Sequence, residues 1–521
     1  MKLATSDMIK EIDNYSQNEL GITIKELMKK SGEAVAKAIC ERAPKNKDVV
    51  ILAGKGNNGA DGYAAATMLQ NEYNVTVYDI FGMGQKSEEG KEFRERYISG
   101  GGRVVAFAPT PEILSHIKNA GCIVDAVFGT GFHGEMPESI RPLAIAIRES
   151  VEAQKIAIDV PLGIDADNGS VSEFAISVGT TVELSFIKPG IISYPARSYV
   201  GKIIYDDLGL PREVITSAFE FKYHMIDKKW VLDNLPKREE NSNKGTFGKV
   251  LLITGSTKYR GAAHLSLEAA LRGGVGLVNF AGTEPLISEL SQKYPEAVYT
   301  KINNISEFTE ADIADLIKLS AHHSATLIGS GSDNTDGLLK LVLGLLQSEG
   351  GPIILDADAI NALSTIGEEG EAAIRESKRE VVITPHPLEF ARLSGVDVAE
   401  VQRGRIKAAE DFARKNSCTV VLKGAGTLIT DGKETYINVY GSSALAKAGS
   451  GDVLAGLAAA LVAQKKISAD KACALAVYYH ACAGESLAEE FSSYGVTPSD
   501  LPAEIARHIA QSEKELKKTD K

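Results

Sequence analysis

The chain has 521 residues, of which 44% are hydrophobic and 24% are charged, and its formal net charge is −12. These proportions are those of a globular protein and exclude a largely disordered or fibrous chain. The acidic balance argues against a nucleic-acid partner, because neutralising phosphates requires a basic face. The longest apolar run, residues 453–463, is too short to span a bilayer, so no membrane partner is predicted.

The five cysteines form neither a disulfide framework nor a pair with metal-ligand spacing. This pattern favours buried thiols in a reducing compartment. The N-terminal residues include acidic side chains before any apolar segment begins, so no signal peptide is predicted. We therefore expect a cytoplasmic protein.

Short β-branched runs alternate with helical stretches along the first half, which is typical of parallel sheets covered by helices. Helices are expected there at residues 59–70 and 88–97. The expected strands are residues 49–53, 75–79, 103–107, 122–127, 156–160, 181–186 and 202–205.

The alternating strand and helix pattern is interrupted between residues 210 and 240. This segment contains two prolines and the charged KREE cluster, and its apolar residues show no strong periodicity. We place a domain boundary near residue 222. Residues 1–222 are expected to form a Rossmann-like domain of three layers with a parallel sheet, and residues 223–521 a second α/β domain. The second domain should end in a long helical tail from residue 453 to about residue 490. The expected strands of the second domain are residues 249–254, 325–329, 352–356, 381–384 and 419–423. For the whole protein we expect a homo-oligomer.

A glycine-rich loop, GKGNNGADG at residues 54–62, follows the first long strand and runs into a helix. Free N–H groups and the positive end of a helix dipole suit a phosphate or pyrophosphate. The spacing is neither GxGxxG nor a Walker A motif. A tight turn would explain the glycines, but it would not need the two asparagines and the aspartate.

Two aspartates follow neighbouring strands of the same domain. Asp125 ends the strand at 122–127 and precedes a glycine-containing loop, and Asp159 ends the strand at 156–160. Ligands of open α/β sheets bind at the carboxyl ends of the strands, and Asn58 lies at the same rim. Either aspartate alone is more often a cap or turn residue, but together with the glycine loops they favour a ligand site.

The motifs GKGNNGADGYAAA, DAVFGTGFHGE and IDVPLGID resemble the YjeF N-terminal family, the NAD(P)HX epimerases, over residues 1–220. The resemblance implies interconversion of the R and S epimers at C6 of hydrated NADH or NADPH, with Asp159 as catalytic acid/base. It also implies a potassium ion on Asn58 and Asp125, since oxygen ligands suit a hard cation. The third metal position holds Leu162, where the family has Ser or Thr. The substrate-binding residues implied besides Asp159 are Asn57, Asn58, Gly59, Ala60, Asp61, Gly129, Thr130, Gly131, Phe132, His133, Gly134 and Glu135.

In the second half, AGSGD at residues 448–452 precedes an apolar helix. Glycines and a serine at a helix N-terminus form an anion hole for a phosphoryl group in transfer. Asp452 is placed to take a proton from an attacking hydroxyl. A helix cap alone would need neither the flanking glycines nor a second phosphate loop, and KGAGT at 423–427 is such a loop.

The motifs NKGTFGKVLLITGSTKYRGAAHLS, LDADAIN, TPHPLE, KGAGT and AGSGDVLAG resemble the ribokinase-like superfamily and, more narrowly, the ADP-dependent (S)-NAD(P)HX dehydratases. The resemblance implies a ribokinase-like α/β domain that phosphorylates the C6 hydroxyl with ADP or ATP, assisted by Mg²⁺, and then loses phosphate. Asp452 would be the general base. The hydrated dinucleotide would contact Ala263, Gly331, His386 and Asp452. ADP would contact Lys423, Gly424, Ala425, Gly426, Thr427, Ser442, Ser443, Ala444, Leu445, Ala446, Lys447, Ala448, Gly449, Ser450 and Gly451.

Together the two resemblances imply a bifunctional NAD(P)H-hydrate repair enzyme that yields NAD(P)H, AMP and phosphate. Two alternatives stay open at this point. The second half could be a ribokinase-like small-molecule kinase that releases a stable phosphoester. The first half could be a non-catalytic binding module.

Overall fold

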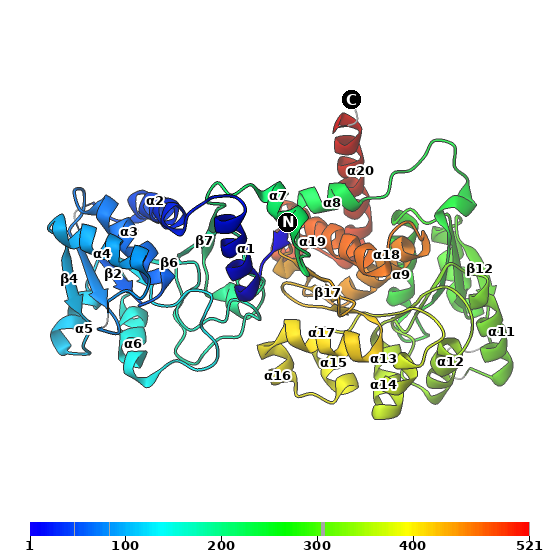
Figure 1. Ribbon diagram of the computed structural model, residues 1–521. Helices are drawn as coiled ribbons and strands as arrows, with labels where there is room; N and C mark the ends of the chain where they lie inside the picture. Colours follow the sequence, from blue (N-terminus) through cyan, green and yellow to red (C-terminus); the bar gives the residue numbers. More distant parts are fainter. Residues whose placement is uncertain (46, 83, 304–307, 520–521) are drawn as a thin grey trace. The chain divides into compact units, whose positions relative to one another are not determined.

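The computed structural model of the protein describes residues 1–45, 47–82, 84–303 and 308–519, and Figure 1 shows its ribbon. The chain divides into two compact units: residues 2–223, called the first unit below, and residue 1 with 224–521, the second unit. Each unit is a sheet covered by helices, so the predicted α/β fold class is confirmed. Within the described ranges, no helix is long and apolar enough to cross a membrane.

The first unit contains a parallel sheet with the strand order β4-β3-β2-β5-β6-β7-β8. All seven expected strands form, and each begins and ends within two residues of the expected position. The strands of this sheet are β2 (Val49–Ala53), β3 (Val75–Asp79), β4 (Arg103–Ala106), β5 (Cys122–Ala126), β6 (Gln154–Ile158), β7 (Thr180–Leu184) and β8 (Lys202–Asp206). A short strand near the N-terminus, β1 (Lys2–Leu3), is not part of it.

Both faces of this sheet are buried, which produces the expected three layers (Figure 1). Ile51 of β2 packs with residues of α1 to α4, whereas its neighbour Leu52 packs on the other face with residues of α5 and α6. Successive strand residues point to opposite faces, so a strand that is apolar throughout serves both helix layers. The helices are α1 (Ser6–Asn18), α2 (Ile24–Arg42), α3 (Asn57–Leu69), α4 (Glu88–Ser99), α5 (Pro111–Lys118), α6 (Arg141–Glu149) and α7 (Arg212–Ala218).

In the second unit the strands lie in the order β9-β18-β17-β16-β15-β14-β13-β10-β11-β12. Pairing is parallel from β12 to β16 and antiparallel from β16 to β18. The five expected strands form, and β9, β11, β12, β17 and β18 are additional. The strands are β9 (Tyr223–Ile226), β10 (Lys249–Ile253), β11 (Leu277–Gly282), β12 (Val298–Lys301), β13 (Ala325–Ile328), β14 (Ile353–Leu355), β15 (Val381–Ile383), β16 (Thr419–Leu422), β17 (Leu428–Thr430) and β18 (Thr435–Asn438).

The helical tail expected from residue 453 to about 490 is divided into two helices, α18 and α19. Lys465, just past the end of α18, has a left-handed φ of 51°, which ends the first of them. The helices of the unit are α8 (Lys228–Asn234), α9 (Arg260–Arg272), α10 (Glu284–Lys293), α11 (Glu310–Ala321), α12 (Asp336–Leu346), α13 (Ala357–Ser364), α14 (Glu368–Arg375), α15 (Pro387–Ser394), α16 (Val398–Arg403), α17 (Arg405–Asn416), α18 (Ser450–Ala463), α19 (Ala469–Gly495) and α20 (Leu501–Thr519).

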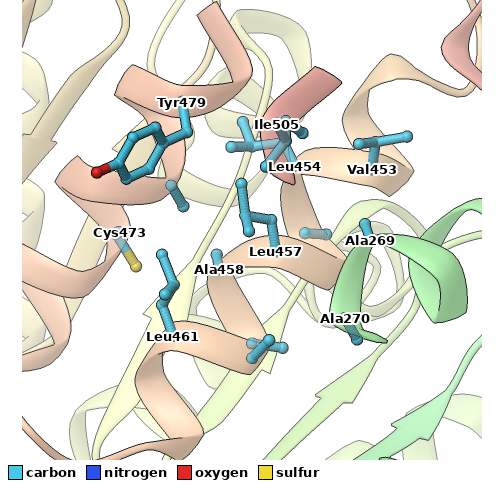
Figure 2. Close-up of a cluster of buried hydrophobic side chains, with 14 of the residues drawn as sticks. Ala269, Ala270, Val453, Leu454, Leu457, Ala458, Leu461, Cys473, Tyr479 and Ile505 are labelled. Carbon is cyan, nitrogen blue, oxygen red and sulfur yellow. The ribbon is translucent and has the colours of Figure 1, made fainter. Parts of the chain in front are cut away.

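Helix α18 is buried along nearly all of its length in the second unit's core, and Figure 2 shows part of the cluster around it. Leu457 and Leu461 of α18 lie among side chains of α9, α19 and α20. A Cβ on Gly456 would lie 2.2 Å from the carbonyl oxygen of Ser266, so only glycine lets α18 approach α9 this closely. The burial of α18 along its length holds its N-terminal turn, which carries Asp452, in one place.

Candidate functional site

A cavity of about 530 Å³ lies at the carboxyl ends of the strands of the first unit. Its walls come from the segments that follow β2, β5, β6 and β7, together with residues of α1 and α2. Of the substrate-binding residues predicted for this unit, those that line the cavity are Asn57, Asn58, Asp61, Gly129, Thr130, Gly131 and Asp159.

Asn58, Gly129 and Asp159 converge on one wall of this cavity. A Cβ on Gly129 would lie 3.3 Å from the Cβ of Asn58 and 3.5 Å from Oδ2 of Asp159. The three residues follow three different strands, β2, β5 and β6, so the rim of the sheet brings them together.

The other predicted residues of this unit are not among those that line the cavity, and their binding roles stay predictions. A Cβ on Gly59 would lie 1.9 Å from the carbonyl oxygen of Gly54, so Gly59 serves the turn into α3. Phe132 is buried and stacks on Phe128, and the Nδ1 atom of His133 lies 2.9 Å from a carboxylate oxygen of Asp165. The three remaining residues of this group are Ala60, Gly134 and Glu135.

Asp159 forms an ion pair with Lys188, a residue that the sequence analysis missed. The side chain of Lys188 is 1% exposed, and its Nζ also lies 3.3 Å from Oε2 of the fully buried Glu183. Burial alone would lower the pKa of Lys188, but attraction to the two carboxylates outweighs it and raises that pKa. The available signal was position, because Lys188 follows β7 within the apolar segment FIKPG at the same rim.

Two further carboxyl groups line the cavity, those of Asp13 from α1 and Asp61 from α3. Burial raises the pKa of Asp13 to about 6, and it also raises the pKa of Asp61 well above its ordinary value. The negative charge of Asp159 adds to both effects. The cavity therefore combines one carboxylate that is paired with a cation and two carboxyls that hold protons more tightly.

The predicted metal position is only partly suited to a hard cation. Asn58 donates from Nδ2 to the carbonyl of Phe128 over 2.8 Å, while its buried Oδ1 has no hydrogen-bond partner in the described ranges. Asp125 accepts N–H groups from Val127 at 3.1 Å and from Leu162 at 2.6 Å. Oδ1 of Asn58 and the carboxylate of Asp125 fit as oxygen ligands, and burial raises the pKa of Asp125 to about 7.

Leu162 offers no side-chain oxygen to such an ion. Its side chain is fully buried in the apolar cluster on the α5 and α6 face of the sheet. Its carbonyl already accepts the N–H of Ile176 at 3.0 Å. In the part of the chain that the structure describes, no group of three or more His, Cys, Asp or Glu side chains is arranged to hold a metal.

In the second unit, Lys423 brings the two predicted phosphate loops together. A Cβ on Gly451 would lie 3.5 Å from Nζ of Lys423, so the ammonium group reaches the N-terminal turn of α18. Nζ also lies 2.9 Å from Oδ1 of Asp356 and 3.9 Å from Oε2 of Glu389. Positive charge and the N-terminus of a helix therefore meet at one point, as binding of a phosphoryl group requires.

Asp452 lies in the first turn of α18, which begins after Gly449 in the left-handed region at φ 101°. Burial raises the pKa of Asp452 to about 7, and repulsion from Asp356 adds to it while Lys423 opposes it. A carboxyl group with such a pKa can exchange protons near neutral pH.

His480 of α19 supports the same turn from behind, and the sequence analysis missed it. Its Nε2 lies 3.1 Å from Oγ and 3.0 Å from the carbonyl oxygen of Ser450. Burial lowers the pKa of His480 to about 4, so the ring is neutral at physiological pH.

The predicted nucleotide loop, residues 423–427, forms the turn between β16 and β17. Arg405 of α17 donates to the carbonyls of Leu422 and Lys423, each over 3.2 Å. A Cβ on Gly424 would lie 3.1 Å from Arg405, and φ at this glycine is 136°. Arg405 is thus a buried residue that supports the loop through two hydrogen bonds, and we call it the brace of the loop below. No motif in the sequence identified it.

The second predicted nucleotide segment, residues 442–451, runs from a short capped turn into α18. Ser442 caps the turn through an N–H of Ala444, and Leu445 lies against Gly484 of α19. Lys447 donates to the carbonyls of Tyr494 and Val496 at the end of α19. Its ammonium group therefore fastens the segment to α19.

Among the predicted dinucleotide contacts, His386 is linked to Lys423 through Glu389. Its Nδ1 accepts the N–H groups of Leu388 and Glu389 at the start of α15, and Glu389 in turn faces Lys423. Ala263 is fully buried, with its Cβ 2.6 Å from where a Cβ on Gly255 would lie. Gly331, at φ 63°, packs tightly on Ala262 of α9 and on Tyr259, the residue that precedes this helix. The contacts of these residues with a ligand stay predictions.

Comparisons with known proteins cover both units. A family model described as NAD(P)H-hydrate dehydratase matches residues 250–507, and one described as YjeF-related protein N-terminus matches residues 24–190. Over 495 residues the chain is 33% identical to the bifunctional NAD(P)H-hydrate repair enzyme Nnr of Coxiella burnetii, covering 95% of this chain and 96% of the relative. The corresponding protein of Escherichia coli is 31% identical over 511 residues, covering 97% and 93%.

Solved structures resemble the second unit. The ADP/ATP-dependent NAD(P)H-hydrate dehydratase of Bacillus subtilis, co-crystallized with ATP and Mg²⁺, is 29% identical. The match covers 56% of this chain and 99% of the Bacillus subtilis chain, with a TM-score of 0.48.

Proposed function

The chain belongs to the family of bifunctional NAD(P)H-hydrate repair enzymes, and we propose how its two units divide the repair. The first unit interconverts the R and S epimers of hydrated NADH and NADPH at C6 of the nicotinamide ring. The second unit dehydrates the S epimer with ADP and yields NAD(P)H, AMP and phosphate. The observation that carries this division is that each unit has its own buried carboxylate cluster, around Asp159 and around Asp452.

In the first unit, Asp159 takes the proton of the C6 hydroxyl and later returns it. C6 carries both this hydroxyl and the ring nitrogen, so loss of the proton lets a carbonyl form as the bond from C6 to nitrogen breaks, and the nitrogen keeps the bonding electron pair and takes a proton, which it loses again on reclosure. Reclosure on either face of that carbonyl gives either epimer. The supporting geometry is the carboxylate of Asp159 on the cavity wall beside Asn58 and Gly129.

In the second unit, Asp452 takes the proton of the C6 hydroxyl while the hydroxyl oxygen attacks the β-phosphate of ADP. Lys423 and the N–H groups at the start of α18 stabilise the negative charge on the phosphoryl group in transfer. Hydroxide is a poor leaving group at neutral pH, whereas phosphate is a good one. The lone pair of the ring nitrogen then expels phosphate, and the loss of a proton from C5 forms the C5–C6 double bond and restores the dihydronicotinamide.

Two ions belong to this proposal. Magnesium would accompany the nucleotide, held through phosphate oxygens and water. Potassium would bind in the first unit, and the unpaired Oδ1 of Asn58 beside the glycine loop supports it. We further propose that the protein acts in the cytoplasm as a homo-oligomer. Light scattering of the purified protein tests the oligomer.

The experiment that tests the division of labour uses the full chain and an NADHX epimer mixture with magnesium and potassium. ADP or ATP is added, and the return of dihydronicotinamide absorbance is followed. Full and prompt recovery of both epimers with one nucleotide supports the proposal. Nucleotide consumption with an accumulating phosphoester would instead establish a small-molecule kinase, and failure to recover the R share would make the first unit a binding module.

A further inference from the structure

Lys188 and Glu183 form a pair of ionisable side chains in the interior of the first unit, where burial raises the pKa of Glu183 to about 8. Lys188 is 1% exposed and Glu183 is 0% exposed, with 3.3 Å between Nζ and Oε2. Lys188 also donates to the carbonyl of Leu184 over 3.0 Å. Burying two charges costs several kcal/mol per ion unless the geometry is good, and an apolar pair would often be at least as stable. Core stability therefore does not explain why these residues are charged.

Asp159 gives a better explanation of the two ionisable residues, because Nζ of Lys188 also contacts Oδ1 of Asp159. Asp159 faces the cavity, whereas Glu183 lies behind Lys188 in β7. The ammonium group thus connects a carboxylate on the cavity wall to a carboxylate in the core.

Asp159 is held in a backbone conformation that aspartate rarely adopts. Its φ is 66°, in the left-handed region, directly after the end of β6. A residue in this region persists only when the surrounding structure holds it there, and such residues cluster at functional sites. The contact with Lys188 is one of the constraints that hold its side chain.

Asp159 differs from the other carboxyl groups of the cavity. Among the ion pairs of the described residues, Asp159 is the only one of the three cavity aspartates that contacts a cationic side chain, since Asp13 and Asp61 take part in none. The charged groups that face the cavity besides these three and Lys188 are Lys10, Lys55 and Lys86.

We propose that Lys188, backed by Glu183, is a positioning residue for epimerisation, which holds the side chain of Asp159 aimed into the cavity. The proposal rests on the proposed function of the first unit. It distinguishes Asp159 from the other two aspartates of the same cavity and assigns to Asp159 the proton of the C6 hydroxyl.

The test replaces the cation with an uncharged side chain of similar length, Lys188→Met, in the full chain. Epimer interconversion is measured against pH without nucleotide. Removing a positive charge in contact with Asp159 should move the low-pH limb of kcat upward by about 1–3 pH units. We expect kcat at neutral pH to fall about 100-fold with little change in KM, and Lys188→Arg to restore part of the loss.

Two controls separate positioning from folding. Lys202→Met removes an exposed lysine from β8 of the same sheet and should leave the epimerase profile unchanged. The double variant Lys188→Met with Glu183→Gln leaves no unpaired buried charge, so it should fold even if the single variant does not. Circular dichroism and thermal unfolding of each variant, compared with the wild type, report whether the first unit remains folded.

The result that overturns the proposal is a folded single or double variant with the wild-type pH limb. Failure of the proposed function itself is distinguishable, because the wild type would then show no interconversion of epimers. In that case carbon NMR of the Asp159 carboxyl group still tests the positioning role. Its titration should move upward in Lys188→Met relative to the wild type, and an unchanged titration would contradict the inference.

Discussion

Nζ of Lys423 lies 2.9 Å from Oδ1 of Asp356, although the two residues are 67 positions apart in the chain. Asp356 follows β14 and Lys423 follows β16, so the pair links the carboxyl ends of two strands of one sheet. Ser330 and Thr384 donate to the same carboxylate over 2.8 and 2.7 Å. Four strand ends therefore fix the ammonium group beside the N-terminus of α18.

Replacing the proposed general base of the second unit should stop repair. Asp452→Asn keeps the shape of the side chain but cannot accept the proton of the C6 hydroxyl. We expect dehydration of the S epimer to fall about 10²–10⁴-fold, as is typical for loss of a general base. The measurement is the return of dihydronicotinamide absorbance with ADP.

Two matched aspartate variants accompany Asp452→Asn. Asp315→Asn changes an exposed aspartate of α11 and should leave the rate unchanged. Asp159→Asn should recover the S share at the wild-type rate and the R share slowly. Near-normal dehydration by Asp452→Asn would assign the base to another group.

The pKa of Asp452 sets the pH dependence of dehydration. Burial raises this pKa from 3.8 to about 7, and the ionised form is the base. The value of kcat/KM for dehydration should therefore fall about tenfold per pH unit below pH 7 and level off above it. A profile that stays flat down to pH 5 would contradict this assignment.

The same pKa shift predicts a stability effect of the opposite sense. The folded protein holds the proton of Asp452 more tightly than the unfolded chain, so its contribution to stability is present below about pH 4 and is lost as the pH rises through 7. Asp452→Asn should thus unfold at a higher temperature than the wild type at pH 8, by a gain of about 1–4 kcal/mol, and this gain should vanish at pH 4. Thermal unfolding at the two pH values measures it.

Removing the brace under the nucleotide loop should weaken nucleotide binding. Arg405→Met leaves the carbonyls of Leu422 and Lys423 without their donor, which costs about 1–3 kcal/mol for each buried group. We expect the Kd for ADP to rise about tenfold or more, and the second unit to lose stability. Calorimetric titration with ADP and thermal unfolding measure the two effects.

A lysine control makes the Arg405 result specific. Burial lowers the pKa of Arg405 to about 10, yet the group remains charged at neutral pH. Arg405→Lys keeps the charge but not the planar fork, so it should restore stability only in part. Unchanged ADP affinity in a folded Arg405→Met variant would contradict the role of the brace.

The potassium proposal predicts that epimerisation depends on Asn58. Replacing potassium with lithium should slow interconversion of the epimers in the wild type, because the smaller ion does not match the same oxygen ligands. Asn58→Leu removes the unpaired oxygen and should abolish the difference between the two salts. Chromatographic separation of the epimers without nucleotide measures the rates. Equal rates in both salts for the wild type would remove potassium from the proposal.

Much of the fold was predictable from local patterns. The strands of the first unit are apolar on both faces, so each stands out as a short β-branched run between helices. Among the strands that were missed, β12 is partly exposed and carries no continuous apolar run. The missed strand β11 is six residues long and buried, but Asn279 interrupts its apolar run. The division between α18 and α19 depends on a single left-handed residue, Lys465, which no composition signal marks.

The sequence by itself determined which chemistry each rim could offer, because glycine loops, asparagines and aspartates follow predictable strands and parallel strands end at one edge of their sheet. Tertiary structure decided which of these groups are charged and where they point. Lys188 and Glu183 reach Asp159 only through the fold, and Arg405 reaches its loop from α17. The reason is physical: a pKa and a side-chain direction depend on burial and on neighbours distant in the chain, neither of which a local pattern contains.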